Sequence, residues 1–114
     1  MKICLAGAGA FGGDRIEARA KPDALAGTAR VGLTRGATDE VAKRFGIGHV
    51  ATDLSESLAR SDVDAVILAT PTQMHASQAI ACLAAGKHVQ VEIPLADSLK
   101  DAESVHAAQQ ASGR

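Results

Sequence analysis

The sequence predicts an α/β fold in which a parallel sheet carries helices on both faces. Short apolar runs typical of buried strands alternate with stretches of helical period along the 114 residues. The first apolar run leads directly into a glycine-rich turn, which is the beginning of a nucleotide-binding β-α-β unit. A chain of this length forms one domain, so residues 1–114 are treated as a single unit.

The first predicted strand spans residues 2–6 and is followed by Gly7-Ala8-Gly9-Ala10-Phe11-Gly12. This is the G-x-G-x-x-G spacing. We expect Gly7 to permit the tight turn, Gly9 to let the backbone approach a pyrophosphate, and Gly12 to let helix and strand pack closely. A plain structural turn is the alternative. The helix at about residues 13–20 is expected to be short, because glycines begin it and a proline follows it.

The middle of the chain predicts two further strands, each followed by a helix. The second strand spans 29–34, and a helix over 39–45 is closed by Gly46. The third strand spans 49–52. Asp53 is the predicted N-cap of the next helix, and Glu56 stands at the capping-box position.

The last two units give the clearest signals. Residues 63–69 form an aliphatic run typical of a strand covered on both faces. Thr72 is predicted to cap a helix over 73–85, which Gly86 ends. A fifth strand spans 88–92, and Ser98-Leu99-Lys100-Asp101 resembles a capping box that opens a helix to about residue 111. Five consecutive β-α units with short connections predict a Rossmann-type sheet.

The composition excludes several classes of protein. The only aromatic residues are Phe11 and Phe45 and the net charge is −1, so we expect no nucleic-acid or anionic-membrane partner. No apolar run is long enough for a transmembrane helix. Cys4 and Cys82 are interpreted as reduced core residues of a cytoplasmic protein. No metal cluster or nucleophilic triad is predicted, and no residue is assigned a catalytic role.

The expected ligand is a dinucleotide, and the residues at the end of the second strand indicate whether it is NAD or NADP. The loop residues Gly7, Gly9, Ala10, Phe11 and Gly12 would hold its pyrophosphate. An NAD site usually has an acidic residue at the end of the second strand, whereas this chain has Thr34-Arg35-Gly36. A hydroxyl and a guanidinium suit a 2′-phosphate, so NADP is favoured over NAD.

The ends of the fourth and fifth strands are expected to flank the nicotinamide half. Thr70-Pro71-Thr72 follows the fourth strand, and Glu92 ends the fifth. His75 lies in the first turn of the next helix, where it either contacts the ligand or is simply exposed. Strand termination by Pro71 and capping by Thr72 are the structural alternatives, and both are compatible with a binding role.

Four segments together resemble the N-terminal domain of the glucose–fructose oxidoreductase/inositol dehydrogenase family. They are Gly7 to Gly12, Ala69-Thr70-Pro71-Thr72-Gln73-Met74-His75, Ala85-Gly86-Lys87-His88-Val89 and Glu92-Ile93-Pro94. The resemblance implies hydride transfer from a hydroxyl or hemiacetal carbon to NADP. It places the cofactor against the loop Gly7 to Gly12, against Thr34 and Arg35, and against Thr70, Pro71, Thr72, His75 and Glu92.

Within that family, the two strand-end motifs look most like a branch that oxidises a cyclic hemiacetal in bacterial aromatic catabolism. Most of the family has Glu-Lys-Pro where this chain has Glu92-Ile93-Pro94, and often a histidine where it has Arg15. The resemblance also implies a sixth strand and a substrate domain after Arg114, and a homo-oligomeric parent protein. We therefore expect the 114 residues alone to bind cofactor weakly without turning over substrate.

Two other functions remain open from the sequence. One is a non-catalytic module that binds or senses NADP(H). The other is a sugar or polyol dehydrogenase of the same family, against which Ile93 argues mildly because the family lysine is absent. Whether the Ile93-Pro94 peptide is cis does not follow from the sequence.

Overall fold

The computed structural model describes residues 2–7, 29–31, 39–40, 43–44 and 47–114. Several predictions lie outside these residues: most of the glycine loop, the helix at 13–20, the end of the second strand and part of the helix at 39–45. Asp39, Glu40, Lys43 and Arg44 from this last segment are helical.

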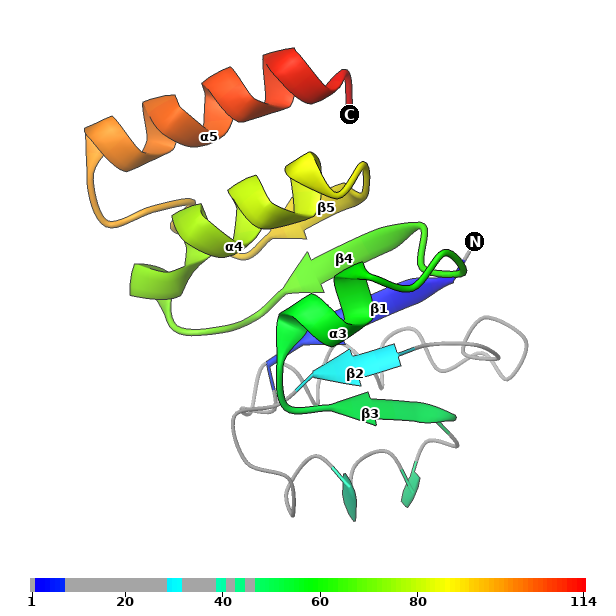
Figure 1. The fold of residues 1–114 in the computed structure, drawn as a ribbon. Coiled ribbons are helices and arrows are strands. Elements are labelled where there is room, and N and C mark those ends of the chain that lie inside the picture. Colours follow the sequence, from blue (N-terminus) through cyan, green and yellow to red (C-terminus); the bar gives the residue numbers. More distant parts are fainter. Residues whose placement is uncertain (1, 8–28, 32–38, 41–42, 45–46) are drawn as a thin grey trace.

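Five parallel strands form one sheet in the order β3-β2-β1-β4-β5 (Figure 1). Their bounds are Ile3–Ala6 for β1, Ala29–Val31 for β2, His49–Ala51 for β3, Ala65–Leu68 for β4 and His88–Val91 for β5. This order is the first five strands of the doubly wound arrangement, with the direction of winding reversing between β1 and β4. The predicted parallel sheet is confirmed, although β3, β4 and β5 are each shorter than the apolar runs suggested.

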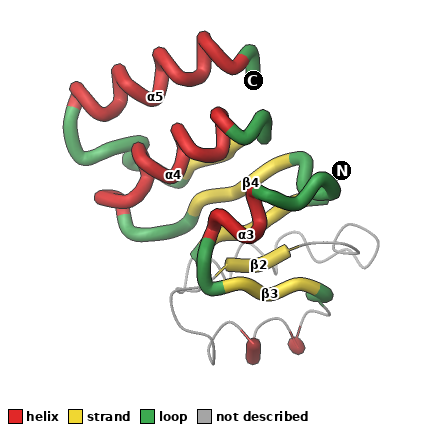
Figure 2. Tube along the Cα trace, viewed as in Figure 1, coloured by secondary structure: helices red, strands yellow, loops and turns green. Residues whose placement is uncertain are grey.

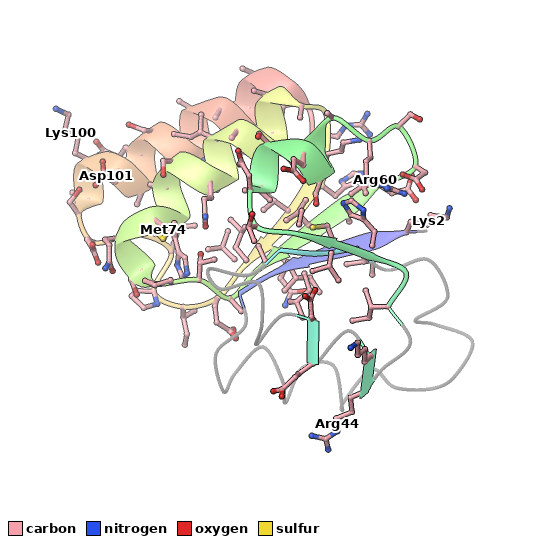
Figure 3. The ribbon with its side chains drawn as sticks, turned by 60° about the horizontal axis from the view of Figure 1, so that its bottom comes forward. Lys2, Arg44, Arg60, Met74, Lys100 and Asp101 are labelled. Carbon is pink, nitrogen blue, oxygen red and sulfur yellow. The ribbon has the colours of Figure 1, made fainter. Side chains whose placement is uncertain are left out.

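Three helices lie on one face of the sheet: α3 (Leu54–Leu58), α4 (Thr72–Ala84) and α5 (Leu99–Ser112). Helix α5 packs against α4 rather than directly over the central strands (Figure 1). Arg44 lies on the opposite side of the sheet from these helices (Figure 3). The sheet therefore has chain on both of its faces.

The central strands are buried on both faces, as their aliphatic runs predict. On the helical face, Cys4, Val66 and Leu68 are fully buried against α3, α4 and α5. On the other face, Leu5 and Ile67 are also buried, together with Ile47. A strand covered on both sides has no polar face, which explains the absence of alternation in the sequence.

Both cysteines are free and buried, as expected of reduced core residues. Burial raises the pKa of Cys4 to about 11 and that of Cys82 to about 12. The neutral thiol is therefore the form present at physiological pH, and both side chains act as small apolar groups.

Three predicted helix ends are confirmed. The Asp53 carboxylate accepts from the Ser55 amide at 2.9 Å, and the Ser98 hydroxyl accepts from the Asp101 amide at 3.1 Å. Gly86 ends α4 with φ +71°. Its amide donates to Leu83 and the Lys87 amide donates to Cys82, so that two carbonyls at the end of the helix are satisfied.

The prediction that Thr72 caps α4 is wrong. The helix begins one residue earlier than expected, with Thr72 as its first residue and Pro71 as the N-cap. Proline fixes φ near the value needed here, and the Pro71 carbonyl accepts from the Met74 amide at 2.9 Å. The Thr72 hydroxyl is consequently not used as a cap.

Within the described residues, none of the helices combines the length and the apolar character needed to cross a bilayer.

Candidate functional site

The carboxyl ends of β1, β4 and β5 meet at one edge of the sheet. The main-chain ladder continues just past the strands: Ala69 donates to Ala6 at 2.8 Å, and Glu92 donates to Leu68 at 3.0 Å. Beyond these bonds the chain turns into the β4–α4 and β5–α5 loops, which leave the sheet at the same end (Figure 2). In a sheet of this topology, the edge next to the reversal of winding is where ligands bind.

Gly7 follows β1 and is forced to be glycine by its neighbours. Its φ is +116°, and a Cβ built on it would lie 2.3 Å from the Ala69 carbonyl oxygen. The backbone after β1 thus passes directly against the end of β4 with no room for a side chain. The positive φ of Gly7 agrees with the tight turn expected there, and the residues that would complete the turn lie outside the described part of the chain.

A cavity of about 420 Å³ opens at this edge between the ends of β4 and β5. It gathers all five described residues that the sequence assigned to the nicotinamide half, together with two neighbours. The lining residues are Ala69, Thr70, Pro71, Thr72, His75, Glu92 and Ile93.

His75 lies in the first turn of α4 and is only 2% exposed, so the expectation that it is simply exposed is wrong. Its two ring nitrogens contact two backbone carbonyls. Nε2 lies 2.7 Å from the Thr70 oxygen, and Nδ1 lies 2.9 Å from the Pro94 oxygen. The side chain therefore spans from the end of β4 to the loop after β5.

The other polar groups of the cavity come from the same two loops. The Thr70 hydroxyl donates to the Gln78 amide oxygen on α4. Glu92 is half-buried at the end of β5. Ile93 is 89% exposed, and the following Ile93-Pro94 peptide is cis. An apolar side chain thus stands at the mouth of the cavity, where the wider family was expected to place a lysine.

The remaining predicted cofactor-binding residues are not among those that the structure describes. They are Gly9, Ala10, Phe11 and Gly12 of the loop, and Thr34 and Arg35 after β2. The described part of the chain contains no group of acidic, histidine or cysteine side chains able to hold a metal ion.

Sequence reasoning missed two features of this site. It did not predict that Ile93 lines the cavity, although this residue is part of the Glu92-Ile93-Pro94 motif. It also left open whether His75 is buried. His75 precedes Ala79 by four residues and Cys82 by seven, and all three are buried on one side of α4. The helical period therefore already placed the imidazole on the inward face.

The opposite, amino end of β4 and β5 has a different character. The buried Lys87 ammonium donates to the carbonyls of Arg60 at 2.8 Å and Val63 at 2.7 Å. Asp62 pairs with Arg60 at 2.8 Å and with Lys2 at 3.2 Å. Hydrogen bonds from the Arg60 guanidinium and then from Lys2 hold the pKa of Asp62 well below its usual range.

The whole chain, residues 1–114, matches a protein family described as an oxidoreductase family with an NAD-binding Rossmann fold. The chain belongs to this family. It is an NAD(P)-binding Rossmann domain, in agreement with the resemblance drawn from the four sequence segments. Members of the family bind NAD(P) cofactors, and the topology of the sheet fits that chemistry.

One curated relative is similar to this chain over almost its whole length. The 4-carboxy-2-hydroxymuconate-6-semialdehyde dehydrogenase of Sphingobium sp. (strain NBRC 103272 / SYK-6) is 56% identical over 113 residues. The match covers 99% of this chain and 36% of the relative. The chain thus spans about a third of the length of that relative.

Two solved structures have the same fold with different cofactors bound. GenD2 from gentamicin A biosynthesis, in complex with NAD, is 32% identical with a TM-score of 0.87, covering 99% of this chain and 32% of its own. The second is a mutant of KijD10, a 3-ketoreductase from Actinomadura kijaniata, in complex with TDP-benzene and NADP. It is 28% identical with a TM-score of 0.84, and the match covers 99% of this chain and 35% of the KijD10 chain. Similarity of fold therefore leaves the choice between NAD and NADP to local residues.

Proposed function

We propose that this chain is the NADP-binding domain of a dehydrogenase that oxidises a hydroxyl or hemiacetal carbon. The observation that carries the proposal is the cavity at the carboxyl ends of β4 and β5. Five residues assigned to the nicotinamide half from sequence alone line it. The Gly7 backbone, which begins the phosphate-binding loop, passes against Ala69 at its edge.

The residues of the cavity fit the nicotinamide end of such a cofactor. Gly7 lies against Ala69 at the start of the segment whose amides we expect to meet the phosphate oxygens. Thr70, Thr72 and Glu92 supply hydroxyl and carboxylate groups suited to a ribose, beside the apolar surfaces of Pro71 and Ile93. When bound, the nicotinamide supplies the acceptor for the hydride that leaves the substrate carbon.

Preference for NADP rests on the residues after β2. Thr34 and Arg35 offer a hydroxyl and a guanidinium, and the sequence Thr34-Arg35-Gly36 contains no acidic residue that would repel a 2′-phosphate. A charge-assisted contact of this kind contributes about 1.5–3 kcal/mol. We therefore expect NADP to bind more tightly than NAD by about tenfold or more.

Calorimetric titration of the protein with NADP and NAD tests this preference. We expect Arg35→Asp to abolish it, because the substitution removes a cation and adds an anion that repels the 2′-phosphate. Lys100→Asp is the matched control, since it makes the same change of charge on the exposed start of α5. Equal affinities in the wild type, or an unchanged preference in Arg35→Asp, would refute the assignment.

For the substrate, the best-supported candidate is the hemiacetal of 4-carboxy-2-hydroxymuconate-6-semialdehyde. The support is the relative that is 56% identical, together with Ile93 in place of the family lysine. Because Ile93 carries no titratable group, it cannot take the proton of the substrate hydroxyl, and we assign no catalytic residue within residues 1–114. NADP reduction by the full-length parent protein, followed at 340 nm with this substrate, tests the proposal.

A sugar or polyol is the second candidate. An inositol 2-dehydrogenase of Rhodococcus erythropolis (strain PR4 / NBRC 100887) is 32% identical over 118 residues, covering this whole chain and 33% of the relative. Turnover of inositol without turnover of the semialdehyde would favour this candidate. Tight NADP binding by the full-length parent protein with no turnover of either would favour the non-catalytic binding module.

The proposed protein is cytoplasmic, with a homo-oligomeric parent of which residues 1–114 are one domain. The buried, unpaired thiols of Cys4 and Cys82 suit a reducing compartment. Size-exclusion chromatography with light scattering tests the oligomeric state.

A further inference from the structure

His75 makes two contacts with backbone carbonyls of the protein, which direct binding of a cofactor by this residue would not predict. Its ring lies between a carbonyl five residues before it, at Thr70, and one nineteen residues after it, at Pro94. Both distances, 2.7 and 2.9 Å, are those of hydrogen bonds. With 2% of the residue exposed, neither ring nitrogen is available to a ligand.

The chemistry of the ring makes these contacts unequal. A carbonyl oxygen only accepts hydrogen bonds, and a neutral imidazole has a single N–H. The neutral ring therefore donates to one carbonyl and turns a lone pair towards the other. Only the imidazolium form, with a proton on each nitrogen, donates to both.

The two carbonyls belong to the two segments that form the cavity, since Thr70 lines it and Pro94 directly follows the lining residue Ile93. Thr70 follows β4 and Pro94 follows β5, and the last main-chain bond between these segments is the one from Glu92 to Leu68. Pro94 has no amide hydrogen, so it cannot donate a further bond of the ladder. Beyond Glu92, the imidazole is a side-chain bridge that joins the two segments.

We propose that His75 is a positioning residue that fixes the distance between Thr70 and the segment Glu92–Pro94, and so shapes the nicotinamide half of the site. The inference rests on the proposed function and deepens it, since it assigns to His75 an indirect role in place of direct contact with the cofactor. Glu92 lines the same cavity as His75 and belongs to the segment that the imidazole holds.

Cofactor fragments separate this role from a merely structural one. Adenosine 2′,5′-bisphosphate carries the adenine half of NADP and lacks the nicotinamide half. In His75→Phe, which keeps a ring and removes both ring nitrogens, we expect the affinity for NADP to fall about tenfold or more. The affinity for adenosine 2′,5′-bisphosphate should stay within about twofold. A general loss of protein stability would instead lower the affinities for NADP and for adenosine 2′,5′-bisphosphate together.

Two further variants make the comparison decisive. His75→Gln retains a donor nitrogen, so we expect it to recover part of the NADP affinity lost in His75→Phe, and it replaces that variant if the latter fails to fold. His106→Phe makes the same substitution at an exposed position of α5 and should leave both affinities unchanged. NADP affinity in His75→Phe and His75→Gln equal to that of the wild type would overturn the proposal.

The contacts themselves are testable without a cofactor. In ¹⁵N-labelled wild-type protein, we expect two hydrogen-bonded ring N–H signals from His75 when the ring is cationic and one when it is neutral. Ring protons that exchange with water as freely as those of His106 would overturn the bridge. If the ring signals are as expected but the wild type binds neither NADP nor NAD, the proposed function fails while the bridge stands.

Discussion

At the amino end of β4 and β5, the Lys87 ammonium holds the carbonyls of Arg60 and Val63, and at their carboxyl end His75 contacts the carbonyls of Thr70 and Pro94. Figure 3 shows Lys2 and Arg60 at the first of these ends and Met74, next to His75, at the other. Each end therefore has a buried side chain that joins two loops through backbone oxygens.

The two ends differ in what surrounds that side chain. A hollow of about 430 Å³ also lies beside Lys87, but Lys87 and Asp64 in its lining are already hydrogen-bonded within the protein. Lys87 is bound to two carbonyls, and the Asp64 carboxylate accepts from the Lys2 amide at 2.7 Å. Beside His75, an exposed Ile93 and the Thr72 hydroxyl, which is not used as a cap, line the cavity. We therefore propose that the same kind of bridge stabilises the fold at one end and shapes a ligand site at the other.

The largest effect is expected at the carboxyl end, from Gly7→Ala. The new Cβ would meet the Ala69 carbonyl at 2.3 Å, and the residue would have to keep φ near +116°. Overlap and backbone strain together should lower the free energy of unfolding by about 3 kcal/mol or more. Denaturant titration measures this. Gly48→Ala, where a Cβ would meet nothing within 4 Å, is the control and should be close to neutral.

The next effect is expected at the amino end, from Lys87→Met. The substitution keeps the length of the side chain and leaves the Arg60 and Val63 carbonyls without their donor, which should cost about 2 kcal/mol of unfolding free energy. The ratio of NADP to adenosine 2′,5′-bisphosphate affinity should not change, in contrast to His75→Phe. Lys100→Met, at an exposed position, controls for the loss of charge. A changed affinity ratio in Lys87→Met would contradict the distinction between a stabilising bridge at the amino end and a site-shaping bridge at the carboxyl end.

The smallest effect is expected from Asp62→Asn, which removes a partly exposed ion pair. Because the pKa of Asp62 is lowered in the folded protein, the stabilisation is present above about pH 4 and is lost as the pH falls through the folded value. Melting temperatures should therefore differ slightly at pH 7 and converge at the lowest pH at which the protein still folds. A difference that grows on acidification would contradict this.

The sequence predicts the sheet well because burial on both faces leaves a strong local pattern. The aliphatic runs of β1 and β4 and the glycine after β1 are visible without any tertiary information. The same holds for Gly86 and Ser98, whose preferences for helix ends are local. The error at Thr72 came from competition between two adjacent residues, because Pro71 already supplies the backbone geometry that a cap requires.

The site was predicted only in part because its contacts join distant segments. Motif positions placed Thr70, Pro71, Thr72, His75 and Glu92 near one another, and the structure brings them to one cavity. The bridge from His75 to Pro94 depends on a carbonyl nineteen residues away, and no local pattern encodes that pairing. The helical period does show that His75 faces inward, which is the part of its role that a sequence can reveal.

Amide chemical-shift mapping of the protein during titration with NADP tests most directly whether the carboxyl end holds the ligand. We predict that the largest changes occur at that end, at Gly7, Thr70, Thr72 and Ile93, with residues 60–64 and Lys87 at the amino end unchanged. Changes concentrated around Lys87 and residues 60–64, or no change at the cavity when NADP is saturating, would contradict the assignment of the two ends.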